Sequence, residues 1–158
     1  FVRDGSDMGQ AIQTSTGNYN HVAIYLDGMI YHASEHAGVV CQEPADFFES
    51  NHLYDIYVYP ELDIQSVKEK ACKHLGAPYN TSFYPDGIGF YCSQYMVEIL
   101  PIFETIPMQF GDEKEEIAPF WQQYYKELGL AVPLHQPGTN PSQLAQSEKL
   151  VYKGRLDD

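Results

Sequence analysis

The sequence predicts an α+β fold in which an antiparallel sheet packs against helices. Residues 20–60 hold several short runs rich in β-forming side chains, and Asp27-Gly28 joins two of these runs. After residue 60 the apolar residues recur with the 3.6-residue period of a helix. Hairpins followed by helices are typical of the α+β class. A chain of 158 residues suits one domain, which we place at 1–158.

The predicted strands lie in the first part of the chain. They cover 20–26, 29–34, 38–42 and 53–60. The first two form a hairpin, because a two-residue Asp-Gly turn between β-prone runs is a strong hairpin signal. Pro60 ends the fourth run, since proline lacks the backbone N–H that a strand needs.

The predicted helices follow from apolar spacing and from capping residues. In a helix over 63–75, Asp63 is the N-cap, Gly76 follows the C-terminus, and the apolar residues fall on one face. Residues 77–89 are predicted as a loop, because they are rich in Pro, Gly, Asn and Asp. Further elements are predicted as a short buried helix at 92–100, a helix at 113–129 with Pro119 in its first turns, a helical turn at 141–146 and a strand at 149–153.

Composition excludes several classes of partner. The net charge of −13 leaves no basic footprint for nucleic acid, and an anionic membrane surface would repel the protein. No run approaches the roughly 18 apolar residues of a transmembrane helix.

Three cysteines cannot all pair internally, so at least one thiol is free. A free thiol favours a reducing compartment, and thus the cytoplasm over the cell envelope or secretion.

Two histidines fall on one face of the predicted hairpin. With Asp27-Gly28 as the turn, His21 and His32 become diagonal neighbours about 7 Å apart at Cα. Packing on a half-buried sheet would explain either histidine alone, but an imidazole pair either binds a metal or assists a nucleophile. The chain has no CxxC or HExxH motif, and His36 diverges from His32 at a strand end. The sequence therefore predicts no metal site and no cofactor.

Cys92 is the candidate nucleophile, because it stands at the start of the predicted helix 92–100. A helix N-terminus stabilises a thiolate, so we expect the pKa of the Cys92 thiol below its usual value of about 8.5. A cysteine nucleophile also needs a base and a group that holds the base. The histidine pair supplies both, and we expect the Cys92 sulfur against a ring nitrogen of His21. The alternative is a small buried hydrophobic side chain, a description that also fits Cys41 and Cys72.

Three segments of the chain resemble a known family. They are "NHVAIYLDGMIYHAS", "GAPYNTSF" and "FYCSQYMVEIL", in this order, and they resemble the circularly permuted branch of the NlpC/P60 cysteine hydrolases. That branch includes the YiiX-like proteins and is related to the lecithin retinol acyltransferases. The resemblance extends over nearly the whole chain, and it implies a papain-like fold with circularly permuted topology.

The resemblance also implies roles for three residues. Cys92 matches the nucleophile, His21 the general base and His32 the third polar residue. Many YiiX-like members carry a carboxylate at the third position, so His32 is closer to the acyltransferase side. Glu35 and Ser34 are the alternatives for the third role.

The predicted function is that of a thiol hydrolase. It cleaves an amide bond through a Cys92 acyl-enzyme, in a cell-wall-type peptide or an N-acyl amino compound. One alternative is an acyltransferase, or a hydrolase of lipid esters or thioesters, with the same Cys-His-His site. A second is a non-catalytic binding module that retains the fold.

The predicted partner is a small peptide or an acylated small molecule, with a lipid as a further candidate. The candidate substrate-binding residues are Tyr19, Tyr25 and Tyr91, although core packing explains these aromatic side chains equally well. The oligomeric state does not follow from the sequence.

Overall fold

The computed structural model describes residues 1–156, so the last two residues of the predicted domain lie outside it. One antiparallel sheet has the order β1-β5-β8, with β1 (Val2–Arg3), β5 (Leu53–Val58) and β8 (Val151–Arg155). A second has the order β2-β3-β4, with β2 (Ile24–Leu26), β3 (Met29–Ser34) and β4 (Gly38–Gln42). The short strands β6 (Ile106–Pro107) and β7 (Pro137–Gly138) pair with each other.

The helices are α1 (Asp7–Thr16), α2 (Pro44–Phe47), α3 (Ile64–Lys73), α4 (Cys92–Ile99), α5 (Pro119–Leu128) and α6 (Pro141–Ala145). The predicted α+β class is confirmed.

The hairpin forms in the predicted register. Asp27 and Gly28 both have positive φ, 53° and 89°, as a two-residue hairpin turn of type I′ requires. Leu26 therefore pairs with Met29. The predicted strand 38–42 is confirmed as β4, which continues the sheet on the other side of β3.

The predicted strand 20–26 is only partly correct, because its first residues leave the hairpin. The backbone N–H of Val2 donates to the His21 carbonyl, and that of Asn20 donates to the Val2 carbonyl, both at 2.9 Å. This part of the chain therefore pairs with β1 instead of extending β2. His21 stands at the end of the second sheet, between the two sheets.

The predicted helix 113–129 is wrong in its first turns, because α5 begins only at Pro119. Proline suits the first helical position, where its missing N–H costs nothing. The Asp112 carboxylate accepts the N–H groups of Lys114 and Glu115, both at 2.8 Å, and so turns the chain before the helix. The helices α1 and α2 were not predicted.

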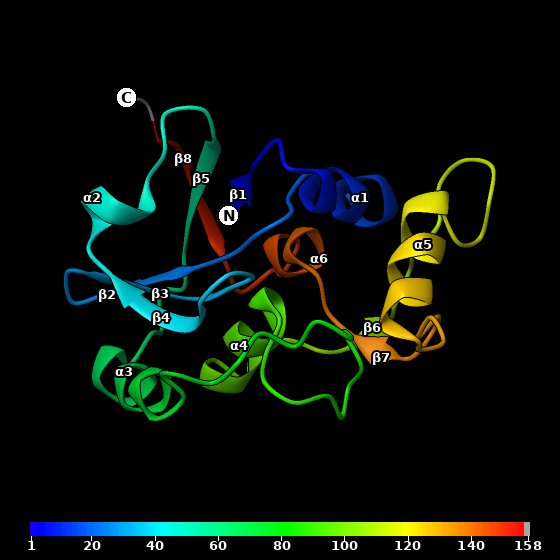
Figure 1. Cartoon of the computed structure of the whole chain (residues 1–158). Helices are drawn as coiled ribbons and strands as arrows, with labels where there is room; N and C mark the ends of the chain where they lie inside the picture. The colour runs from blue at the N-terminus through cyan, green and yellow to red at the C-terminus, as the bar shows by residue number, and fades with distance from the viewer. Residues whose placement is uncertain (157–158) are drawn as a thin grey trace.

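The helices α3 and α4 begin as the sequence indicates. The Asp63 side chain accepts the N–H of Ser66 and caps α3. The first residue of α4 is Cys92, and the helix contacts β3, α3 and α6. In Figure 1 the β2-β3-β4 sheet lies between α2 on one side and α3 with α4 on the other. Successive residues of β3 therefore face α2 and α4 in turn.

The segment before Cys92 is fixed by a close backbone approach. Phe90 donates its N–H to the Pro78 carbonyl at 3.0 Å, and Asn80 donates to the Phe90 carbonyl at 3.2 Å. Gly89 has a φ of 85°, and a Cβ there would stand 1.9 Å from the Pro78 oxygen. The contact requires glycine, and it holds residues 78–80 beside the start of α4.

We predict that Gly89→Ala lowers the free energy of unfolding by more than about 2 kcal/mol, because it adds a backbone clash to the cost of a positive φ. Gly76→Ala is the matched control, since Gly76 has a similar φ of 89° but nothing within 4 Å of where a Cβ would stand. The control should lose only about 1 kcal/mol. Urea unfolding of both variants measures the difference, and equal losses would contradict this account of Gly89.

Candidate active site

The two histidines of the hairpin face meet side by side. His21 Nε2 lies 2.9 Å from His32 Nδ1, so the predicted neighbourhood of these two rings is confirmed. His32 Nε2 in turn lies 2.5 Å from Gln42 Oε1, a contact that the sequence analysis missed. The β3–β4 register pairs His32 with Val40 and so places Gln42 diagonally opposite on the same face. The three side chains form a row, which we call the histidine row.

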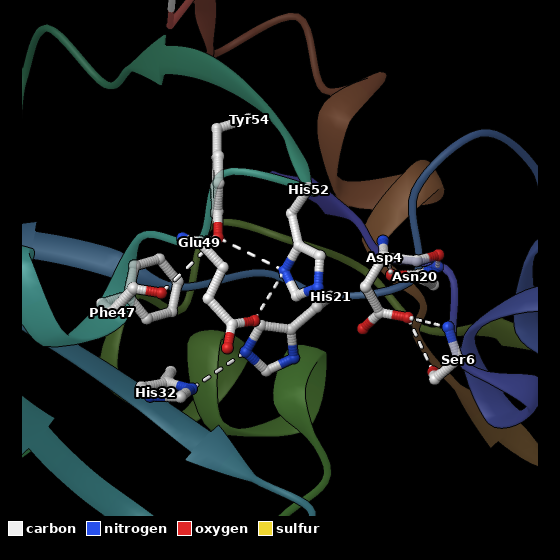
Figure 2. Close-up of polar contacts among 9 residues, drawn as sticks. All are labelled: Asp4, Ser6, Asn20, His21, His32, Phe47, Glu49, His52 and Tyr54. Atoms are coloured by element: carbon white, nitrogen blue, oxygen red, sulfur yellow. Dashed lines mark hydrogen bonds and ion pairs between the residues drawn. The ribbon is translucent and has the colours of Figure 1, made fainter. Parts of the chain in front are cut away.

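The face of the histidine row is covered by α2. The Phe47 ring centroid lies 4.9 Å from that of His32 and 6.5 Å from that of His21. Figure 2 shows the two imidazoles with Phe47 beyond one side and Asp4 beyond the other. Burial lowers the pKa of His21 to about 3, and the neighbouring His32 acts in the same direction. Burial also lowers the pKa of His32, against an opposing hydrogen bond to Gln42. Both rings are therefore neutral near pH 7.

Cys92 is buried at the first residue of α4, with 4% of its surface exposed. Its sulfur faces backbone N–H groups of Val22, Ser93 and Cys92 itself, which favour the thiolate. Burial is the larger effect and raises the pKa of the Cys92 thiol to about 12. The expectation of a lowered pKa is therefore wrong, because loss of water around the sulfur outweighs the helix N-terminus.

The expected contact between the Cys92 sulfur and the His21 ring is not formed. The sulfur lies against the backbone of Val22, the residue that follows His21. Within residues 1–156 no hydrogen bond joins Cys92 Sγ to the His21 ring, and none engages His21 Nδ1. The link between the two side chains is therefore indirect: Cys92 Sγ contacts the backbone of the residue next to His21, and not the His21 ring.

Tyr79 is a candidate site residue that the sequence analysis missed. It lies in the segment held by Gly89, and the backbone N–H of Cys92 faces its hydroxyl. Burial raises the pKa of Tyr79 well above its usual value, so the hydroxyl keeps its proton. Tyr79 comes from a loop with no periodic pattern, and only the fold brings it to Cys92.

Two hollows of opposite character meet at Ile12 and Tyr79. The first, which we call the cysteine cavity, measures about 60 Å³ and contains Cys92 among mainly apolar side chains. Its walls include Tyr91, Met108, Phe110 and Trp121. The second, which we call the histidine cleft, measures about 410 Å³ and contains His21 and His32.

The histidine cleft is acidic. Its lining includes the carboxylates of Asp4, Glu35, Asp46 and Glu49, and no lysine or arginine of residues 1–156 lines it. Glu49 is engaged by His52 at 3.1 Å. The field in the cleft therefore favours a cation.

The other predicted site residues lie in different places. Tyr91 lines the cysteine cavity and precedes Cys92 as the N-cap of α4. Tyr25 is 61% exposed on the hairpin, and the Tyr19 hydroxyl donates to Asp55 at 2.6 Å. The structure therefore does not bring Tyr19 and Tyr25 to Cys92.

Of the alternatives for the third role, Glu35 is exposed and lines the histidine cleft, whereas Ser34 accepts backbone N–H groups of its own turn. The side chain that contacts the His21 ring is His32.

Papain-like enzymes combine a cysteine nucleophile with a histidine that a further polar side chain orients, and Cys92, His21 and His32 are residues of these types. Comparison with known proteins agrees with this class. A family model described as "Permuted papain-like amidase enzyme, YaeF/YiiX, C92 family" matches residues 1–151. The chain therefore belongs to the C92 family of permuted papain-like amidases, a family of enzymes that hydrolyse amide bonds.

Among solved structures, the chain is similar to that of the metalloprotein yiiX from Escherichia coli O157:H7. The TM-score is 0.75 with 19% sequence identity, over 98% of this chain and 94% of that chain. At this identity the likeness shows the fold, which is the predicted permuted papain-like fold. No curated protein was found to match the chain.

The yiiX protein is described as a metalloprotein. Within residues 1–156 of this chain, no group of three or more His, Cys, Asp or Glu side chains is placed to hold a metal ion. No described helix combines the length and apolar character needed to cross a bilayer.

We predict that iodoacetamide at neutral pH labels Cys92 last among the three cysteines, because the buried thiol is protonated and the reagent needs a thiolate. Cys72 is exposed and should react first. Peptide mapping by mass spectrometry at successive times measures the order. In urea the three cysteines should react at similar rates, and preferential labelling of native Cys92 would contradict the neutral resting thiol.

We predict that the buried histidines make the protein less stable in mild acid. The pKa of His21 is lower in the folded chain than its usual value of 6.5, so the unfolded chain binds more protons between pH 6.5 and 3. Stability is complete above pH 6.5 and falls as pH decreases through this range, by up to about 1.4 kcal/mol per pH unit for one ring. Urea unfolding between pH 7.5 and 4 measures the slope.

Two variants isolate the contribution of His21 to this slope. His21→Gln should flatten it, whereas His36→Gln, which removes an exposed histidine, should not. Carboxylates that titrate below pH 5 affect all three proteins alike. Identical slopes in wild type and His21→Gln would contradict the prediction.

Proposed function

We propose that the chain hydrolyses an amide bond with Cys92 as nucleophile, His21 as general base and His32 as the residue that holds His21. The observation that carries this proposal is the 2.9 Å contact of the His21 and His32 rings, one residue from the backbone N–H that faces Cys92 Sγ. Membership of an amidase family supports the reaction class.

The proposed reaction begins from a neutral thiol and a neutral imidazole. The proposal requires the Cys92 sulfur to reach His21 Nδ1, which it does not contact in this structure. The sulfur attacks the amide carbonyl while Nδ1 takes the thiol proton, so a thiolate is not formed in advance. The oxyanion receives hydrogen bonds from the Cys92 N–H and the Tyr79 hydroxyl, which face each other beside the sulfur.

Collapse of this intermediate breaks the carbon–nitrogen bond. The imidazolium of His21 gives its proton to the departing amine and leaves a thioester on Cys92. Water then enters, His21 accepts one of its protons, and attack on the thioester releases the acid and restores the thiol. Throughout, His32 keeps the His21 ring in place through the Nε2–Nδ1 contact.

The two hollows suggest which part of the substrate lies on each side. The cysteine cavity is mainly apolar and much smaller than the histidine cleft, about 60 Å³ against about 410 Å³, so it suits a short apolar acyl group. The acidic histidine cleft suits an amine portion that carries a positive charge. We therefore propose a short N-acyl derivative of a cationic amine as the substrate class.

A second candidate function is acyl transfer from a lipid ester or thioester. The observation that favours it is His32 in the third position, as on the acyltransferase side of the resemblance. The small volume of the cysteine cavity argues against a long chain in this conformation.

Matched amides test the proposed substrate class. N-Propionyl-1,5-diaminopentane carries an ammonium group on the amine side, and N-pentylpropanamide lacks it. N-Decanoyl-1,5-diaminopentane keeps the charge and lengthens the acyl chain. We expect hydrolysis of the first probe at least tenfold faster than either of the others, measured by mass spectrometry of the released amine. Equal rates for charged and neutral probes would refute the role of the cleft, and a faster decanoyl probe would favour the lipid alternative.

We predict that Cys92→Ala abolishes both hydrolysis and the acyl-enzyme, whereas His32→Gln lowers the rate by roughly 10²-fold, because His21 then acts in a poorly held orientation. Intact mass after p-nitrophenyl acetate measures the acyl-enzyme. Cys72→Ala is the matched control and should retain full activity. Melting temperatures of all variants should change by only a few degrees, as expected for about 1 kcal/mol in a chain of this size. Turnover by Cys92→Ala, or unfolding of His32→Gln, would refute these assignments.

A further inference from the structure

The histidine row ends in an amide, and this end sets the direction of its hydrogen bonds. His21 Nε2 contacts His32 Nδ1 at 2.9 Å, and His32 Nε2 contacts Gln42 Oε1 at 2.5 Å. The three side chains come from the segment before β2, from β3 and from the last residue of β4. Each link joins a different pair of chain segments.

The polarity of the row follows from the chemistry of each group. The carbonyl oxygen of a glutamine amide can only accept, so His32 Nε2 must carry a proton and donate it. A neutral imidazole has a single N–H, and therefore His32 Nδ1 carries a lone pair and accepts. His21 Nε2 must then donate, which leaves the lone pair of His21 on Nδ1.

We propose that Gln42 is a positioning residue that fixes the tautomer of His21 through His32. This inference rests on the proposed function, because Nδ1 is the nitrogen that takes the Cys92 proton. If the acceptor at Gln42 were absent, His32 could carry its proton on Nδ1 instead. It would then donate to His21 Nε2, the His21 proton would move to Nδ1, and the base would be blocked.

The same arrangement suits both the neutral and the protonated form of His21 in the proposed catalytic cycle. When His21 takes the thiol proton at Nδ1, its Nε2–H continues to donate to His32. No proton has to move along the row, and Gln42 needs no change of partner. An uncharged acceptor also leaves His32 neutral, so that its Nδ1 remains an acceptor beneath the covering Phe47 ring.

Two substitutions of Gln42 separate the acceptor from the size of the side chain. Gln42→Met keeps the length and removes the acceptor, whereas Gln42→Glu keeps an acceptor oxygen. Measurements at pH 8.5 keep His32 neutral beside the new carboxylate. Gln65→Met, on the exposed side of α3, is the control for loss of a glutamine.

The first readout is the tautomer itself, and it does not depend on activity. Nitrogen-15 chemical shifts of the histidine rings distinguish Nδ1–H from Nε2–H, and His21→Gln and His32→Gln assign the signals. We expect both rings as Nε2–H in wild type, Gln42→Glu and Gln65→Met, and a mixture with Nδ1–H in Gln42→Met. His21 as Nδ1–H in the wild type, or unchanged tautomers in folded Gln42→Met, would overturn the proposal.

The second readout is the rate at which p-nitrophenyl acetate acylates Cys92, followed by mass spectrometry of the Cys92 peptide. We expect a roughly tenfold slower rate in Gln42→Met, recovery of most of this loss in Gln42→Glu, and no change in Gln65→Met. A Gln42→Met rate equal to that of wild type would overturn the proposal. If wild-type Cys92 is never acylated, the proposed function fails, and the ring-nitrogen shifts still decide whether Gln42 sets the tautomers.

Discussion

The contact between the His21 and His32 rings is the interaction on which the rest of the site depends. It joins the segment that leaves the hairpin to β3, and it lies where the two three-stranded sheets approach each other. His21 lies before the first residue of β2 that pairs with β3. The backbone hydrogen bonds of the hairpin alone therefore do not hold it. The backbone contacts with Val2 on one side and the ring contact with His32 on the other hold it in place.

Burial determines the resting chemistry of this site. The same covering that orders the two rings removes the water that would stabilise an imidazolium or a thiolate. The pKa of His21 therefore falls to about 3 and that of Cys92 rises to about 12, so the pair rests in its neutral form. In the proposed reaction, the backbone N–H groups around Cys92 and the hydroxyl of Tyr79 act mainly on charge that develops during reaction, which is where such groups contribute most to catalysis.

The surroundings of Cys92 and of the histidine row differ because they belong to different layers. Cys92 belongs to the apolar cluster that α4 forms with β3 and α3, whereas the histidine row faces α2 and an acidic cleft. Tyr79 borders both hollows, and the close approach of Gly89 to Pro78 holds it there. A substrate that spans this boundary would meet an apolar wall on one side and negative charge on the other, which is the basis for the proposed orientation.

The sequence by itself determined the parts of this arrangement that depend on local rules. The Asp27-Gly28 turn fixed the hairpin register, strand 38–42 was predicted to the residue, and α4 begins at Cys92 as its apolar spacing and preceding loop indicate. Gln42 was within reach of the same reasoning, because the register across the turn at 35–37 places it diagonal to His32. Tertiary structure alone decided the departure of His21 toward β1, the approach of Tyr79 to Cys92 and the raised pKa of the thiol. These depend on contacts between segments distant in the chain and on exclusion of water, and neither leaves a periodic pattern in the sequence.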